Sequence, residues 1–302
     1  MKAHVKMLWL LCFLPFSVAT GQNYQCDTDA NGYWFPMVNG KLVKSIEIVQ
    51  NPAKKYAVKV EGKLTTGYIY DIIFEDKYKP LYISYKGTVT EYGGFDVGKF
   101  GVLDKLGNEI LPCEYDLIYI EENLCYYYQG KIVDYFPANG TWGILNYNGT
   151  EKIPFGLKYN QIGMFKNGYA RVFRGVFNQE TEMYIGNYGF IDEKGNEVVE
   201  CSISTEKYNH PISVSEGMIS VAIKINDPDQ IYNYLYGFID MIGKEKIPCI
   251  YTEVSDFHNG ISHVDSNNIK ICGCGGMYID KTGKRVYPSK KEVDNYYEKC
   301  RF

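Results

Sequence analysis

Short apolar segments separated by turn residues recur along most of the chain, and residues 236–251 show the pattern clearly. In this unit, YGFIDMIGKEKIPCIY, an apolar segment (236–239) is followed by a turn that begins at Asp240 and contains Gly243, and then by a second apolar segment (246–250). Short apolar runs bounded by Asp and Gly are typical of strands joined in a hairpin. The unit therefore predicts a β-hairpin.

The same hairpin occurs five times. The copies are FGVLDKLGNEILPCEYD from Phe100, WGILNYNGTEKIPF from Trp142, YGFIDEKGNEVVEC from Tyr188, YGFIDMIGKEKIPCIY from Tyr236 and a weaker MYIDKTGKRVYP from Met277. Successive turn glycines are separated by 42, 46, 48 and 40 residues. Self-similarity at such a period predicts stacked units, each of which buries its apolar face against its neighbours.

A second piece follows each of the middle turns. It reads FKNGYARV from Phe165, SEGMISV from Ser215 and FHNGISHV from Phe257, with a worn counterpart at residues 123–128. In each piece a turn glycine precedes an alternating strand, so each repeat offers at least three strands and no helix. A short helix is expected only at residues 290–299.

The remainder of the chain is less regular. Strand-like segments at residues 42–49, 56–60, 68–74 and 81–85 are separated by turn residues. We interpret residues 22–98 as one or two degenerate repeats or an N-terminal β-cap. This part is expected to be continuous with the five copies in residues 99–288 as one domain, followed by a tail at 289–302.

The turn of each copy has the same polar and glycine positions. These are Asp104 and Gly107, Asn146 and Gly149, Asp192 and Gly195, Asp240 and Gly243, and Asp280 and Gly283. Asp or Asn at the first position can accept backbone N–H groups, and glycine tolerates the positive φ of a tight turn. Cation ligation by the acidic residues is the weaker alternative, because calcium needs several converging oxygens.

An aromatic residue followed by glycine opens four copies, at Phe100, Trp142, Tyr188 and Tyr236. We expect these rings to anchor the start of the strand in the core. Truncation of a buried ring to alanine is expected to cost about 3–5 kcal/mol.

This order of pieces, aromatic-Gly-x-Ile-Asp-x-x-Gly, an apolar-Pro segment and then Phe-x-x-Gly with a strand, resembles the WG repeat family, also called KWG repeats. The resemblance covers about residues 99–288. Only Trp142 supplies the eponymous tryptophan, Met277 replaces the first glycine of the last copy, and Glu200 replaces the proline seen at Pro112 and Pro248. The resemblance implies an all-β repeat array, which is propeller-like or alternatively open and solenoid-like. It implies no general enzymatic activity and supplies no catalytic residues to assign.

The N-terminus has the layout of a secretory signal peptide. Lys2 and Lys6 flank an apolar run (7–16) that precedes small residues near 17–21. An uncleaved anchor is the alternative, but the run is short for a membrane span. Cleavage near residue 21 predicts a secreted or periplasmic protein with no membrane span.

The whole chain has a net charge of −4, which disfavours nucleic-acid binding.

Eight cysteines follow the expected signal peptide, an even number compatible with disulfides: Cys26, Cys113, Cys125, Cys201, Cys249, Cys272, Cys274 and Cys300. A Cys26–Cys300 bond would tie the chain ends of a closed ring. We interpret Cys113, Cys201 and Cys249, which occupy equivalent repeat positions, as small buried side chains. Cys272 and Cys274 are expected to be half-cystines or buried thiols, with a soft-metal or redox site as the alternative.

No catalytic signature accompanies the repeats. His210, His258 and His263 have no metal-ligand spacing, and the sequence contains no G-x-S-x-G elbow, P-loop or dinucleotide fingerprint. We therefore expect no cofactor or metal, and a non-enzymatic binding or scaffold module for a protein partner. A glycan-binding module that uses exposed residues among the 29 tyrosines is an alternative. An enzyme whose site is assembled between repeats is a further one. Specificity should lie where the copies differ, in residues 126–139, 175–187 and 225–235.

Overall fold

The computed structural model describes residues 24–28, 33–76, 78–90, 94–133, 136–178, 180, 183–225, 233–266 and 276–293. Within these ranges the chain forms strands almost throughout, arranged in antiparallel sheets. Of the predicted C-terminal helix, only residues 290–293 are described, and they are helical. The all-β repeat fold predicted from the sequence is confirmed.

Five of the described sheets have four antiparallel strands in chain order. Their strands are β7 (Ile72–Phe74), β8 (Leu81–Val89), β9 (Phe95–Asp104) and β10 (Glu109–Tyr115); β11 (Leu117–Glu121), β12 (Leu124–Val133), β13 (Phe136–Asn146) and β14 (Glu151–Leu157); β15 (Gln161–Lys166), β16 (Tyr169–Asn178), β17 (Met183–Asp192) and β18 (Glu197–Ser204); β19 (His210–Ser215), β20 (Met218–Lys224), β21 (Tyr234–Asp240) and β22 (Glu245–Tyr251); and β23 (Glu253–Val254), β24 (Ile261–Asp265), β25 (Met277–Asp280) and β26 (Arg285–Val286).

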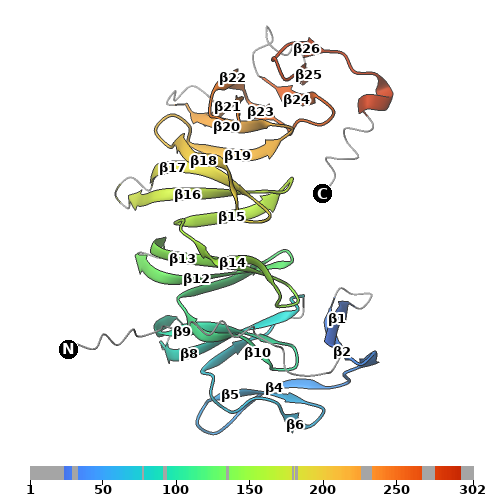
Figure 1. Cartoon of the computed structure of the whole chain (residues 1–302), viewed down its shortest axis with the longest axis vertical. Helices are drawn as coiled ribbons and strands as arrows, with labels where there is room; N and C mark the ends of the chain where they lie inside the picture. The colour runs from blue at the N-terminus through green and yellow to red at the C-terminus, as the bar shows by residue number, and fades with distance from the viewer. Residues whose placement is uncertain are drawn as a thin grey trace, which may run out of the picture.

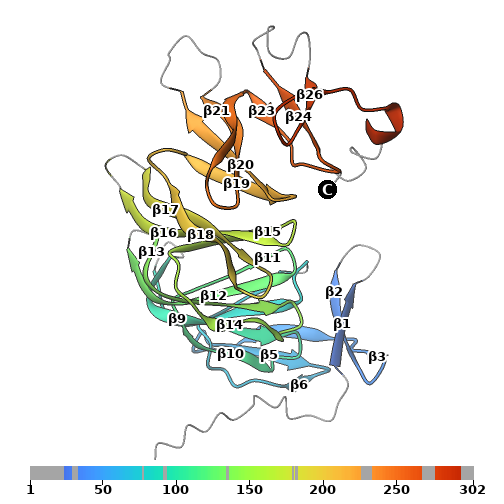
Figure 2. The same ribbon diagram turned by 45° about the horizontal axis from the view of Figure 1, so that its top comes forward.

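Two three-stranded sheets precede them in the chain. They consist of β1 (Tyr24–Thr28), β2 (Trp34–Val38) and β3 (Lys41–Leu42), and of β4 (Ile46–Gln50), β5 (Tyr56–Val60) and β6 (Lys63–Leu64). Sheet β1–β3 lies beside the array (Figures 1 and 2), where the Trp34 ring is 5.0 Å from that of Tyr147 and the Tyr33 ring is 5.1 Å from that of Tyr78.

The hairpin recognised in the sequence forms the third and fourth strands of each sheet, and the second piece forms the first two. A sheet therefore starts upstream of its aromatic-Gly motif, and the expected boundary at residue 99 falls inside β9. The third strand is also longer than expected, because it pairs along the whole second strand, as from Leu124↔Asn146 to Val133↔Phe136 in β12 and β13. The aromatic residues consequently lie within these strands rather than at their start.

The sheets pack face to face, and the cores lie between them. Trp142, Ile144 and Ile153 of sheet β11–β14, for example, belong to one core cluster with Val172 and Ile191 of sheet β15–β18. Inner sheets are covered on both faces, so residues 218–222 of β20 are buried without the alternation expected for a half-exposed strand.

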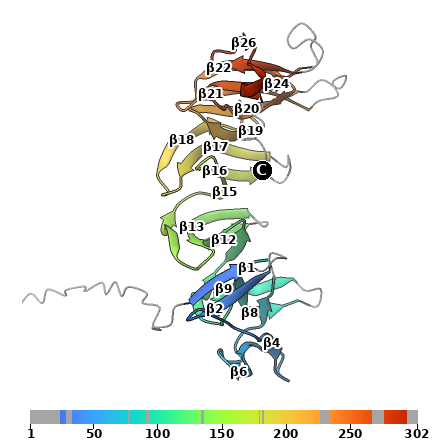
Figure 3. The same ribbon diagram turned by 90° about the vertical axis from the view of Figure 1, so that its right-hand side faces the viewer.

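The stacked sheets form an open array. Sheet β4–β6 and sheet β23–β26 lie at opposite ends of the long axis (Figures 1 and 3). Of the two arrangements expected from the sequence, the described sheets adopt the open one. Several two-residue turns that join first and second strands lie on the same edge, among them Asn167-Gly168 and Glu216-Gly217, and both residues of each have positive φ.

Candidate functional site

A cavity of about 530 Å³ lies where sheet β11–β14 meets sheet β15–β18. Its lining comes from β11, β13, β15, β16 and β17 and includes rings from each sheet. Ligand cavities of proteins span roughly 300–1,000 Å³ and are mostly apolar with a few placed polar groups. The cavity therefore has the size of a ligand site, and its lining combines aromatic rings with polar groups.

Aromatic rings form most of its apolar wall. Trp142, Phe173 and Tyr188 are 1–3% exposed, and the Phe173 ring centroid lies 5.0 Å from that of Tyr188. The Tyr119 ring stands edge-on to Trp142, with centroids 6.0 Å apart, and its hydroxyl donates to the carbonyl of Ile162 at 3.1 Å. Burial raises the pKa values of Tyr119 and Tyr188, so both phenols stay neutral at physiological pH.

Arg171 of β16 supplies a positive charge to this wall. Its Nη1 donates to the carbonyl of Pro211 at 2.8 Å, and its Cζ lies 5.1 Å from the centroid of Tyr188. Among the described residues, no carboxylate forms an ion pair with it. A guanidinium carries five N–H donors in a planar fork that fits a carboxylate.

Two further residues shape the cavity beside Arg171. Gln161 donates from Nε2 to the Tyr184 hydroxyl at 3.0 Å, which fixes the amide in the wall. Gly163 leaves space: a Cβ at this position would lie 3.5 Å from the Arg171 carbonyl oxygen and 3.8 Å from the Arg171 Cβ, both ordinary contacts. A Cβ is therefore accommodated at position 163 in ordinary contact with Arg171, and the backbone conformation there does not require glycine.

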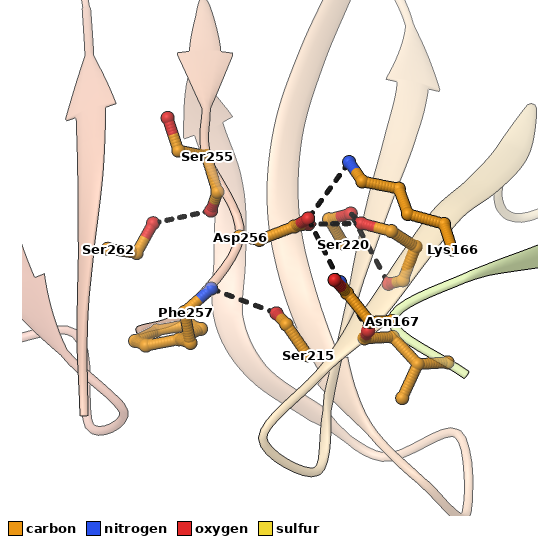
Figure 4. Close-up of polar contacts among 10 residues, drawn as sticks. Lys166, Asn167, Ser215, Ser220, Ser255, Asp256, Phe257 and Ser262 are labelled. Carbon is orange, nitrogen blue, oxygen red and sulfur yellow. Dashed lines mark hydrogen bonds and ion pairs between the residues drawn. The ribbon is translucent and has the colours of Figure 1, made fainter. Parts of the chain in front are cut away.

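A second polar cluster joins three sheets around Asp256, which lies between β23 and β24 (Figure 4). Its carboxylate accepts bonds from Lys166 Nζ at 2.8 Å, from Asn167 Nδ2 at 3.1 Å and from Ser213 Oγ. Burial opposes its ionisation, but these donors outweigh burial and hold the pKa of Asp256 below its usual range. We refer to Asp256, Lys166, Asn167 and Ser213 as the Asp256 clamp.

The hydrogen bonds of the Asp256 clamp and its neighbours link adjacent sheets. Asn167 also donates to the carbonyl of Val214 at 3.0 Å, and Ser215 Oγ accepts from the backbone N–H of Phe257 at 2.9 Å. Each serine donates to or accepts from a fixed partner, and the carboxylate that could act as a base is ionised and surrounded by donors. The arrangement holds neighbouring sheets together rather than activating a nucleophile.

The repeated Asp and Gly residues lie in the turns between third and fourth strands. Each of Asp104, Asp192, Asp240 and Asp280 accepts two backbone N–H bonds of 2.8–3.1 Å within its own turn. Asn146 differs, because its amide donates to Thr150 instead. The glycines Gly107, Gly149, Gly195, Gly243 and Gly283 have φ of 80–86°. Within the described ranges, no cluster of three or more His, Cys, Asp or Glu side chains is placed to hold a metal.

The four aromatic positions are not equally buried. Trp142 and Tyr188 are 2% and 3% exposed and line the cavity, whereas Phe100 and Tyr236 are only partly buried. Trp142 also donates from Nε1 to the carbonyl of Tyr159 at 3.0 Å. The glycan-binding alternative depends on exposed tyrosines. Of the described tyrosines, Tyr126 and Tyr128 are buried between sheets, whereas Tyr33, Tyr78 and Tyr287 are exposed, with Arg285 over the Tyr287 ring.

The four described cysteines of the repeats have free thiols. Cys113, Cys201 and Cys249 are half-buried in the fourth strands, and Cys125 is buried in β12. Burial raises the pKa of Cys201 and Cys249 to about 11, so these thiols are weak nucleophiles at neutral pH. Cys272, Cys274, Cys300, residues 1–21 and the Cys26 side chain lie outside the described residues, as does most of the segment 225–235.

Sequence reasoning missed a recurring aromatic and glycine arrangement. The Tyr85 and Tyr128 rings lie over facing glycine pairs, Gly87↔Gly98 and Gly130↔Gly140, where a Cβ on Gly98 or Gly140 would come within about 2.5 Å of the ring. Asp71, Asp116 and Asn160 accept the backbone N–H of the first glycine at 2.9 Å. The signal was present: Tyr-Asp or Tyr-Asn precedes the first strand at residues 70–71, 115–116, 159–160 and 208–209.

Arg171, Gln161 and Gly163 were missed for another reason. They are ordinary members of the second piece and its flank, and only packing shows that they border a cavity. The segments 126–139 and 175–187, expected to carry specificity, extend the β12–β13 and β16–β17 hairpins, and Phe136, Phe177 and Tyr184 in them line the cavity.

A family profile described as WG containing repeat matches residues 100–131, 142–175, 188–203 and 236–268. The chain is a WG-repeat protein. The matched segments begin at the aromatic-Gly motifs of four copies and, in three of them, continue into the first two strands of the next sheet. A comparison with curated proteins finds none that matches.

Solved structures give only distant similarity to this WG-repeat protein. A eukaryotic initiation factor is 8% identical with a TM-score of 0.27, covering 89% of this chain and 88% of the other. An acylaminoacyl peptidase of Pyrococcus horikoshii is 11% identical with a TM-score of 0.29, covering 89% and 46%. AztD of Citrobacter koseri is 10% identical with a TM-score of 0.25, covering 88% and 70%. These scores are too low to assign a function.

Proposed function

We propose that this WG-repeat protein is a non-enzymatic binding module that holds a short segment of a partner protein in the cavity between sheets β11–β14 and β15–β18. The single observation behind the proposal is the cavity itself, lined by rings and by a cation without a carboxylate partner among the described residues. Buried aromatic pockets with a few polar groups are typical anchors for a partner's side chains.

The reactive groups of the described chain support a binding role over a catalytic one. The clamp carboxylate is ionised and saturated with donors, and the repeat thiols have raised pKa values. The described part contains no helix long and apolar enough to cross a membrane. A secreted or periplasmic location remains our proposal from the N-terminal residues 1–21.

The test fills the cavity. Gly163→Trp places a large ring beside Arg171, and its φ lies outside the left-handed region, so the backbone tolerates the change. Gly156→Trp is the matched control, because Gly156 lies exposed in β14 with open space around its Cβ position. Both variants should unfold at the wild-type temperature in circular dichroism.

Binding is measured with a library of synthetic hexapeptides that includes free and amidated C-termini. We expect selected peptides to bind the wild-type protein and Gly156→Trp alike in fluorescence anisotropy, and Gly163→Trp at least ~10-fold more weakly, because the added ring removes contacts worth more than 1.4 kcal/mol. Selected peptides that bind all three proteins equally, or a library without any binder, would contradict the proposal.

A further inference from the structure

We propose that the cavity recognises the C-terminal residue of its partner, with an aromatic side chain among the rings and the terminal carboxylate on Arg171. This inference rests on the proposed function and names the chemistry of the bound segment. The carboxylate is the deciding group, and Arg171 is the residue that reads it.

Arg171 gives the cavity a positive charge that favours an anionic ligand. Arg171 is half-buried against Tyr188, and its hydrogen-bond acceptor in the described structure is one neutral carbonyl, that of Pro211. The other described arginine of this sheet, Arg174, pairs with Glu197 at 3.0 Å. A partly desolvated cation without a counter-charge favours an anionic ligand, and a planar guanidinium binds a carboxylate through two parallel bonds.

The aromatic rings of the cavity wall favour an aromatic side chain in the ligand. The Tyr119 and Trp142 rings meet edge-on, and the Tyr184 ring lies 5.4 Å from that of Phe173. Rings in such a wall pack best against another ring, offset or edge-on. The wall that borders Arg171 therefore suits an aromatic side chain better than a flexible aliphatic one.

The guanidinium of Arg171 and the rings lie close together, which limits how far apart the ligand's carboxylate and ring can be. Arg171 is in cation–π distance of Tyr188, which itself touches Phe173, so ligand groups for both must be close together. A C-terminal aromatic residue carries its ring and its carboxylate on one backbone position. Trp142, Phe173 and Tyr188 line the cavity and are almost fully buried, so a ring bound there is shielded from water. The amide of Gln161 lies in the same wall and offers a polar partner for the last peptide group.

The experiment compares three labelled hexapeptides on the intact protein. One ends in Phe with a free carboxylate, the second is its C-terminal amide, and the third is an amide with Glu before the Phe. We expect the amide to bind the wild-type protein about 10- to 100-fold more weakly than the free acid, the range expected for one charge-assisted hydrogen-bonded pair.

Arg171→Gln and Arg171→Lys separate recognition from structure. Arg171→Gln should weaken binding of the free acid by the same factor while leaving the amide unchanged, and Arg171→Lys should fall between, because it keeps the charge without the fork. Gly156→Trp should bind all three peptides as the wild type does.

Three results would overturn the inference: acid and amide bind equally, Arg171→Gln weakens both alike, or the internal Glu restores the affinity of the amide. The last would assign Arg171 to a side-chain carboxylate. Failure of the proposed function looks different, because then no form of the peptide binds in a manner that Gly163→Trp abolishes.

Discussion

Equivalent positions of the repeat form a cavity in one place and a closed contact in another. Arg171 and Ser220 occupy the same place in the second piece, in β16 and β20. Arg171 borders the aromatic cavity, whereas Ser220 is 4% exposed and lies 3.2 Å from Ser213 Oγ beside the Asp256 clamp. β16 has 10 residues and β20 has 7, and the side chain at this position also differs, so one repeat position borders a cavity in one sheet and packs closely in the next.

The largest expected effect concerns the cavity wall. Trp142→Ala should lower the free energy of unfolding by about 3–5 kcal/mol, because it empties a buried site and removes the Nε1 bond to Tyr159. Tyr236→Ala should cost clearly less, since Tyr236 is only partly buried. Urea denaturation of both variants measures the difference, and equal losses would show that the cavity wall carries no special share of the core.

Asp256→Asn tests how much the Asp256 clamp contributes to stability. This change leaves Lys166 and Ser213 without a carboxylate and should cost about 1–3 kcal/mol at neutral pH. The pKa of Asp256 is lowered in the folded protein, so its contribution is present above the pKa of the unfolded chain and is lost as pH falls through the folded value. Wild-type stability should therefore drop below about pH 4 more steeply than that of the variant. Parallel pH profiles would argue against the clamp.

The turn between third and fourth strands recurs in the sheets of Arg171 and Ser220, and Gly243→Ala tests it. Gly243 has φ of 80° and open space around its Cβ position, so the expected cost of about 1–2 kcal/mol comes from the backbone alone. Gly156→Ala, at ordinary φ, should change stability little. Thermal unfolding of the two variants checks this, and an equal melting temperature would remove the role assigned to the positive φ.

The smallest effect is expected for Arg171→Ser, which introduces at the cavity the residue type found at the equivalent position, Ser220. Loss of one bond to Pro211 and of the contact with Tyr188 should cost about 1 kcal/mol. A loss of 3 kcal/mol or more in urea denaturation would mean that Arg171 is a structural residue and would weaken its assignment to a ligand.

The repeat hairpins could be predicted because their signals are local. Asp240 and Gly243 specify a turn by their own hydrogen bonds and φ, and the turns of Asp104, Asp192 and Asp280 form the same bonds. The offset between the sequence repeat and the sheet was not visible, because a strand's length depends on its partner: β9 starts at Phe95 since β8 pairs with it upstream of Phe100. The Tyr-Asp pairs were readable in principle but needed the copies to be aligned at the first strand.

By itself, the sequence determined the all-β fold, the period of the array and the residues of its turns, because these depend on alternation and on contacts a few residues apart. Only the tertiary structure decided that the described array is open, that Trp142 and Tyr188 border a cavity while Tyr236 does not, and that Asp256 meets Lys166 from two sheets away. Those outcomes depend on side chains far apart in the chain, whose distances are set by the packing of one sheet on the next.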